Sequence, residues 1–113
     1  MDTNDAILAK ADELGNLIRD TEIYRNFKRM SGMLSEDAGA TRLFQEYLQM
    51  SGSLKERQDR GDIIEKYETD ELKNLLDIIS ENDIIMQYVG AQKEYIDLLE
   101  KIHQEIVSAD FEF

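Results

Sequence analysis

The chain has 113 residues, 42% of them hydrophobic, and its 25 acidic and 13 basic residues give a net charge of -12. This length and apolar fraction suit one domain with one core and argue against a disordered tail. The absence of cysteine excludes disulfides, thiolate metal ligands, cysteine-bound iron–sulfur clusters and thiol nucleophiles, while the acidic balance disfavours direct binding of nucleic acid or anionic lipid.

Apolar residues that recur every three or four positions predict a first helix over about residues 4–19, capped by Thr3 or Asn4. Thr21 is then the expected cap of a short second helix, whose apolar side ends near Leu34. The chain contains no proline, so long helices can run without that kind of break.

A third helix is predicted to begin at Ser35 or Asp37 and to end at Gly61, which we expect to adopt a left-handed conformation. Gly52 lies inside this helix and weakens it relative to alanine. We interpret Gly52 as a tolerated residue or as a point of close helix crossing, and a hinge is the alternative.

The stretch 61–69 is consistent with either a loop or an early helical turn. Thr69, Asp70 and Glu71 form a good N-terminal signal, so the fourth helix is predicted over about residues 70–80.

The fifth helix is predicted to start at Asn82 and Asp83 and to be the longest. It carries an apolar stripe with one polar break, made of Ile85, Tyr88, Gln92, Tyr95, Leu99, Ile102 and Ile106. Such a stripe needs another helix to cover it, and the shorter helices do not easily supply one, which favours a homodimer. The residues predicted to mediate self-association are Tyr88, Gln92, Tyr95 and Leu99. Gln92 either fixes the register of that contact or is simply exposed.

These elements predict an all-α protein, a helical bundle of about five helices with a long C-terminal helix, in dimeric form. Residues 1–108 are expected to form a single domain and residues 109–113 a tail. The tail ends in Phe111, Glu112 and Phe113; it is expected to fray, and docking on a partner is the alternative.

Glu100 and His103 form a Glu-x-x-His pair, the spacing with which di-iron helical bundles hold metal. Such sites need two pairs and two further glutamates, whereas this chain has one histidine. We therefore interpret His103 as a surface residue, with a metal site in a dimer as the alternative. Other acid pairs, such as Glu65 and Glu68, are interpreted as a solvated acidic face. No catalytic, cofactor-binding or metal-binding residue is predicted, and no cofactor.

Arg25, Lys28 and Arg29 form one compact basic cluster on one side of the second helix. The simplest interpretation is an intramolecular partner for the acidic surface. The functional interpretation is a contact for an acidic patch of a partner protein. Binding of nucleic acid through the same cluster is a rival that the net charge opposes.

The order of stripe and cap residues along the chain resembles one known family. The residues that carry the resemblance are Thr21, Tyr24, Asp37, Ala40, Leu43, Phe44, Leu54, Gln58, Gly61, Leu76, Asn82, Tyr88, Ala91, Tyr95 and Leu99. Over about residues 6–107 the chain is similar to the YlbF/YmcA family of small bacterial helical proteins, which includes a YheA-like branch.

The resemblance implies an all-helical, dimer-prone domain without known catalytic activity. Members of the family act in Gram-positive bacteria as regulatory partners that form a complex with one another and with a third protein. That complex influences messenger-RNA processing by ribonuclease Y, and with it competence, biofilm formation and sporulation. Some members are linked to iron–sulfur clusters through cysteines, a feature that this cysteine-free chain does not share. A YheA-like protein of unassigned role is the alternative within the family.

We therefore expect a non-enzymatic helical adaptor that binds itself and a larger protein, either another family member or an RNA-processing complex. The absence of a long apolar run and the acidic N-terminus favour a cytoplasmic protein with no membrane contact. A metal-dependent helical enzyme that uses Glu100 and His103 is the rival from another class.

Overall fold

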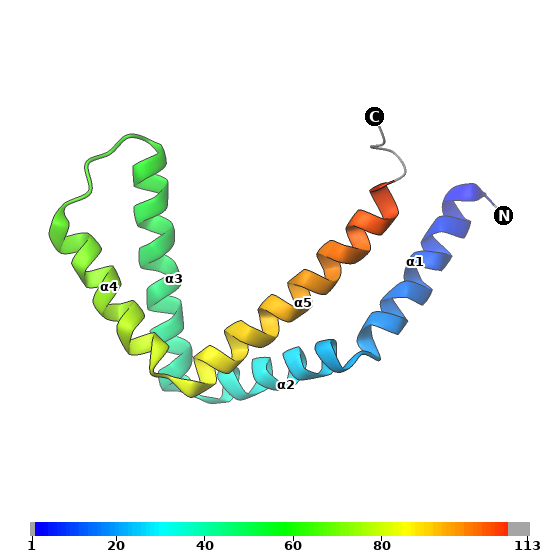
Figure 1. Cartoon of the computed structure of the whole chain (residues 1–113), viewed down its shortest axis with the longest axis horizontal. Coiled ribbons are helices and arrows are strands. Elements are labelled where there is room, and N and C mark those ends of the chain that lie inside the picture. The colour runs from blue at the N-terminus through cyan, green and yellow to red at the C-terminus, as the bar shows by residue number, and fades with distance from the viewer. Residues whose placement is uncertain (1, 109–113) are drawn as a thin grey trace. The chain divides into compact units, whose positions relative to one another are not determined.

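The computed structural model describes residues 2–108, and within that range it consists of helices and their connections, without a strand. The helices are α1 (Thr3–Arg19), α2 (Glu22–Glu36), α3 (Ala38–Asp59), α4 (Lys66–Ser80) and α5 (Asp83–Val107) (Figure 1). This confirms the predicted all-α class, and α5 is the longest helix with 25 residues. The predicted tail 109–113 lies outside the described residues.

Side-chain caps start three of the helices where the sequence places them. Thr21 Oγ1 accepts a hydrogen bond from the Tyr24 backbone N–H at 3.1 Å. The Asp37 carboxylate accepts from the Ala40 N–H at 2.9 Å. Asn82 Oδ1 accepts from the Ile85 N–H at 3.0 Å. Each cap satisfies one of the donors that a helix start leaves without an intrahelical partner, so these three predicted starts are confirmed.

The predicted cap of α1 is wrong. Asp2, not Thr3 or Asn4, precedes the helix in an extended conformation, and its carboxylate accepts from the Asn4 N–H at 3.4 Å. Aspartate is among the strongest N-cap residues, because its short side chain reaches the free N–H groups of the first turn and its charge suits the helix dipole.

The predicted start of α4 is also wrong, because the helix begins at Lys66 and not at Asp70. The Glu65 backbone N–H donates to the Glu68 carboxylate at 2.9 Å, as in a capping box. The Thr69 hydroxyl donates to the Lys66 carbonyl at 2.9 Å. Thr69 therefore bonds within the first turn of a helix that has already begun.

Gly61 ends α3 as predicted, with a φ of 83°. The Gly61 N–H donates to the Gln58 carbonyl at 3.0 Å, and the Asp62 N–H donates to the Arg57 carbonyl at 2.9 Å. These two bonds form a Schellman motif, in which glycine adopts the left-handed backbone conformation that residues with a Cβ atom disfavour.

Two compact units make up the chain, one of residues 30–90 and the other of the residues before 30 and after 90. The first unit contains the end of α2, all of α3 and α4, and the start of α5. Its core consists of Leu34, Ala40, Ile79 and Ile85, one from each of these helices. Partly buried side chains surround it, among them Phe44 and Tyr88, whose ring centroids are 5.8 Å apart in an edge-to-face arrangement.

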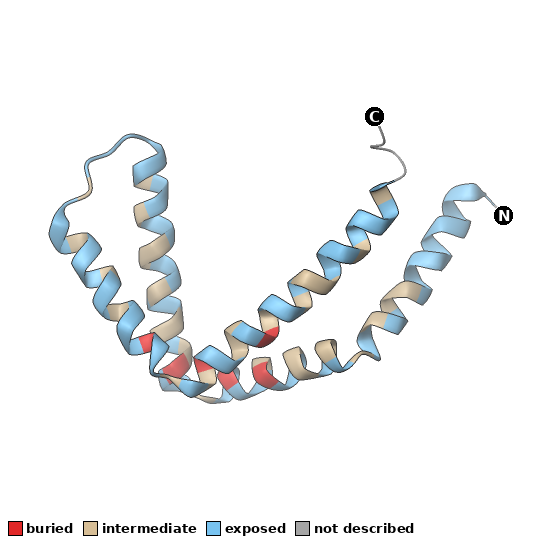
Figure 2. Ribbon diagram, viewed as in Figure 1, coloured by how far each residue is buried: buried red, intermediate tan, exposed pale blue. Residues whose placement is uncertain are grey.

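Within the same unit, α3 and α4 pack on each other as a helical hairpin (Figure 1). Partly buried side chains recur along the facing sides of both helices, whereas most of the remaining surface is exposed (Figure 2). The hairpin thus holds its tip, residues 60–65, at the end of two paired helices.

The second unit contains α1, the first half of α2 and most of α5. Tyr95 of α5 stacks on Phe27 at 4.9 Å between ring centroids and meets Tyr24 edge-on at 5.6 Å. Thr21 Oγ1 donates to the Ile18 carbonyl at 2.6 Å, which fixes the corner between α1 and α2. No residue of α1 is buried. Leu14 and Ile18 are partly buried, whereas Ile7, Leu8 and Leu17 are exposed.

Candidate protein-interaction surfaces

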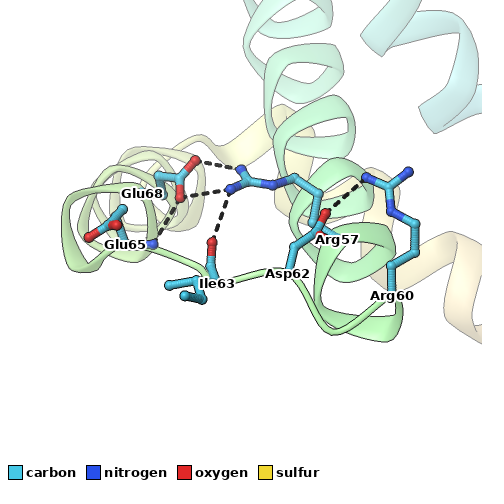
Figure 3. A network of polar contacts seen from close by, with 6 residues as sticks. All are labelled: Arg57, Arg60, Asp62, Ile63, Glu65 and Glu68. Carbon is cyan, nitrogen blue, oxygen red and sulfur yellow. Dashed lines mark hydrogen bonds and ion pairs between the residues drawn. The ribbon is translucent and has the colours of Figure 1, made fainter.

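A network of ion pairs and hydrogen bonds fixes the tip of the α3–α4 hairpin (Figure 3). The Arg57 guanidinium donates to both carboxylate oxygens of Glu68, at 2.5 and 3.2 Å, and also to the Ile63 carbonyl at 3.3 Å. Arg60 forms a further ion pair with Asp62 at 3.2 Å. A bidentate arginine–carboxylate pair fixes geometry as well as distance, so Arg57 holds the connecting loop against the first turn of α4.

The hydrogen bond from Arg57 is the main reason that the pKa of Glu68 is lower than its ordinary value, and the bond from the Glu65 backbone N–H adds to it. The same pair raises the pKa of Arg57. Both groups are therefore fully charged at neutral pH, and they are hydrogen-bonded to each other. We therefore assign the Arg57–Glu68 pair a structural role, because neither group exchanges a proton near neutral pH.

Two shallow hollows lie on the hairpin, with volumes of about 200 and 290 Å³. The first is lined by Met50, Ser53, Leu54, Arg57, Glu68 and Glu71. The second is lined by Ser51, Leu54, Lys55, Gln58, Ile64, Thr69 and Leu72. Near them, Ile63 is 81% exposed and Tyr67 is 63% exposed. Exposed apolar residues beside shallow hollows are typical of a surface that contacts another protein. Ile63 lies in a stretch without helical periodicity, so its sequence pattern does not predict this surface.

The structure places Arg25, Lys28 and Arg29 on the surface of α2, all three exposed. Arg25 lies 4.0 Å from Asp20, the limit for an ion pair, and both side chains are mostly exposed. Arg29 donates a short hydrogen bond to Asn26. An exposed pair at this distance contributes little to stability, so the cluster is accessible to a partner, and its role in binding stays a prediction.

The four residues predicted to mediate self-association do not lie together on an open face. Tyr88 contacts Phe44 and Tyr95 contacts Phe27, so both tyrosine rings pack within their own units. Gln92 is partly buried and Leu99 is 37% exposed. Exposed apolar residues of α5 that the predicted set omits are Met86, Ile96 and Ile106.

Glu100 and His103 are both exposed on α5. Among the described residues, no three histidine, cysteine, aspartate or glutamate side chains come together as a metal site would require. The Glu-x-x-His pair in one copy of the chain is thus an isolated pair, and a metal site in a dimer stays the alternative to the predicted surface role of His103.

No helix within residues 2–108 combines the length and the apolar character that crossing a membrane requires.

Comparison with protein families matches residues 7–109 to a family described as control of competence regulator ComK, YlbF/YmcA. Comparison with the curated proteins finds no match. Among solved structures, the chain is similar to a protein of unknown function (DUF964) from Bacillus stearothermophilus, with a TM-score of 0.75, 20% identity, and coverage of 92% of this chain and 91% of that one. It is also similar to Bacillus subtilis RicA, whose crystal structure was determined in complex with RicF; the TM-score is 0.71 and the identity 20%, over 92% of each chain.

Proposed function

The chain belongs to the YlbF/YmcA family of competence-control regulators, and from this membership we propose that it is a non-enzymatic adaptor that acts by binding other proteins. The Bacillus subtilis RicA structure contains RicF as a partner, so we propose that the partners of this chain include a related helical protein. The finer part of the proposal is that the assembly forms in the cytoplasm and influences ribonuclease Y-dependent messenger-RNA processing, with effects on competence, biofilm formation and sporulation.

The observation that carries the proposal is the exposure of large apolar side chains on every helix. Examples are Leu17 on α1, Met33 on α2, Leu48 on α3, Leu76 on α4 and Ile106 on α5, with exposures between 44% and 66%. Single exposed apolar residues are ordinary, but a small helical protein that carries them on all its helices has apolar surface for partners to cover.

Charge supports a specific role for the basic cluster of Arg25, Lys28 and Arg29. A protein with a net charge of -12 repels acidic partners over most of its surface, whereas α2 offers three exposed positive charges in two turns. Complementary charge steers encounter and selects partners more than it adds affinity. We propose that this cluster faces an acidic patch of the partner protein.

Affinity purification of the tagged full-length chain from its native host tests the proposal. The expected result is co-purification of a second family member or of components of an RNA-processing complex. Recovery of the chain with no specific protein under conditions that preserve weak complexes would contradict the adaptor function.

The triple variant R25E/K28E/R29E tests the role of the cluster. We expect it to lose most of the captured partner while its circular dichroism spectrum stays helical. The matched control is K10E/K66E/K73E, which reverses three exposed charges on other helices and changes the net charge equally. If the two triple variants retain the partner equally well, the cluster is not the contact.

A further inference from the structure

The second hollow of the α3–α4 hairpin combines apolar and basic residues. Three apolar side chains of its lining, Leu54, Ile64 and Leu72, are partly buried. Lys55 lines it from α3, and Thr69 lines it from α4. A shallow hollow of about 290 Å³ suits the side chains of another protein better than a small molecule, which binds in a deeper cavity.

Two exposed leucines extend this lining away from the hairpin tip. Leu48 precedes Ser51 of the lining by three residues, and Leu76 follows Leu72 by four, so each lies on the same face of its helix as the hollow. Because α3 runs toward the tip and α4 runs away from it (Figure 1), both leucines lie at the same end of the hollow. Leu48 is 52% exposed and Leu76 is 46% exposed. The lining of this hollow together with the two leucines is here called the hairpin face.

Lysines flank the hairpin face on both helices. Lys55 belongs to its lining, and Lys73 follows Thr69 of the lining by four residues on α4. Both lysines are exposed, and neither forms an ion pair with another residue of the described range 2–108. Their charges are therefore available to a partner.

Acidic residues occur toward the two ends of the hairpin face and not along its middle. Asp59 and Glu65 lie toward the tip, and Asp77 lies beyond Lys73 in the opposite direction. The middle of the face, which Lys55 and Lys73 flank, is thus positive, although the whole chain has a net charge of -12.

The first hollow of the same hairpin has the opposite character. Its one basic residue, Arg57, is paired with Glu68, and Glu71 adds a further negative charge. The two hollows thus differ in the sign of their charge, and the positive one adjoins the exposed leucines.

We propose that the hairpin face is a docking site for an acidic amphipathic helix of a partner protein. The proposal rests on the adaptor function proposed above and deepens it by naming the chemistry of one partner. Apolar side chains of the partner helix, spaced three and four residues apart, contact Leu48, Leu72 and Leu76, as in other helix-in-groove complexes. Acidic side chains on the flanks of that helix meet Lys55 and Lys73, which selects acidic partners over others.

The net charge of the chain favours a protein helix over other negatively charged partners. Nucleic acid and anionic membranes present extended negative charge, which a chain with a net charge of -12 repels over most of its surface. One helix presents acidic groups over a short distance, so the two flanking lysines can meet them locally.

The hairpin face and the basic cluster of α2 are separate surfaces. The cluster belongs to the unit that includes the residues before 30, and the hairpin face belongs to the unit of residues 30–90. Because the two surfaces share no residue, we propose that they bind two different partners, and variants of one surface leave the other intact.

A synthetic peptide tests the proposal on the full chain. The probe is a fluorescent helical peptide of about 18 residues, long enough to be helical in isolation, with leucines on one face and glutamates on both flanks. A peptide of the same composition in scrambled order, without an apolar face, is the control. Fluorescence anisotropy should show that wild type binds the helical peptide at least roughly tenfold more tightly than the scrambled one.

Two pairs of variants identify the contact. K55E/K73E should weaken peptide binding roughly tenfold, whereas K10E/K101E, which reverses two exposed lysines on other helices, should stay within about twofold of wild type. L48E/L76E should abolish binding, because it places charges against the apolar side of the peptide. Its matched control is L8E/L17E, at leucines of α1 that are 67% and 66% exposed. Circular dichroism checks that every variant stays helical.

The variants of the α2 cluster complete the test. K10E/K66E/K73E should bind the peptide weakly and still capture the protein that contacts the cluster, whereas R25E/K28E/R29E should bind the peptide normally and lose that protein. If both variants lost the same ligands, the two surfaces would not be separate.

Failure of wild type to bind the helical peptide at about 100 μM, or equal binding of the scrambled peptide, would overturn the proposal. Equal effects of K55E/K73E and K10E/K101E would do the same, as would binding of RNA or anionic vesicles through the two lysines without binding of the peptide. If these outcomes occur while the tagged chain still captures a partner from its host, the adaptor function stands and the hairpin face fails. If the peptide behaves as expected but no partner is captured, the hairpin face stands and the adaptor function fails.

Discussion

Replacing Ile85 with alanine tests whether the small core of residues 30–90 determines the stability of the fold. Ile85 is 0% exposed and belongs to one core cluster with Leu34, Ala40 and Ile79, which lie on the other three helices of this unit. Removing three carbons forfeits about 2.4 kcal/mol of transfer free energy, and the cavity adds to the loss. Measured isoleucine-to-alanine changes of this kind cost about 2–5 kcal/mol. We expect I85A to destabilise the protein by about 3 kcal/mol.

For a chain of this length, a loss of about 3 kcal/mol lowers the melting temperature by about 13 °C. Thermal and urea unfolding followed by circular dichroism measure the change at fixed protein concentration, because any self-association would make the melting temperature depend on concentration. I78A removes the same three carbons from a residue of α4 that is 56% exposed, and it should cost less than about 1 kcal/mol. Equal losses in I85A and I78A would refute the reasoning, since burial would then not determine the cost.

Two further substitutions test the α3–α4 hairpin. Gly52 lies inside α3, and a Cβ added there meets nothing within 4 Å, so G52A should stabilise the chain by about 0.5–1 kcal/mol in urea unfolding; a loss of stability would show that another helix approaches this point. The pKa of Glu68 is lowered in the folded state, so its pairing with Arg57 stabilises the fold above the ordinary pKa of 4.5 and is lost as the pH falls through the lower folded value. E68Q should therefore unfold more readily than wild type at neutral pH, and the difference should shrink in acid. A difference that is the same at both pH values would contradict this account.

The start of a helix can be predicted from the sequence where the capping side chain has a single local role. Thr21, Asp37 and Asn82 each follow a completed helix and precede an apolar stripe, so each has one plausible use, as a cap. The predicted start of α4 is wrong because two signals overlap. Thr69 followed by two acids is typical of a helix cap, whereas Glu65 and Glu68 form the capping box that begins the helix. Only the bond that Thr69 donates to Lys66 separates the two.

The residues predicted to mediate self-association differ in their surroundings for a geometric reason. The apolar stripe of α5 contains residues that pack within the chain and residues that remain exposed. Tyr95 packs on Phe27, whereas Leu99 is 37% exposed. Periodicity shows that a helix has an apolar side, but which part of that side the chain itself covers depends on the helices that pack against it.

The side chains of α5 differ in burial along the helix. A helix that is apolar on all sides is buried in the core of its own chain. A helix with a single apolar side packs that side either on the core or on a partner protein. Here Ala91 is buried within the chain while Ile96, little more than one turn later, is 45% exposed. A contact made by the exposed side of α5 would leave the buried side packed within the chain. The adaptor function proposed above requires this separation, because the fold of an adaptor must persist while its partners exchange.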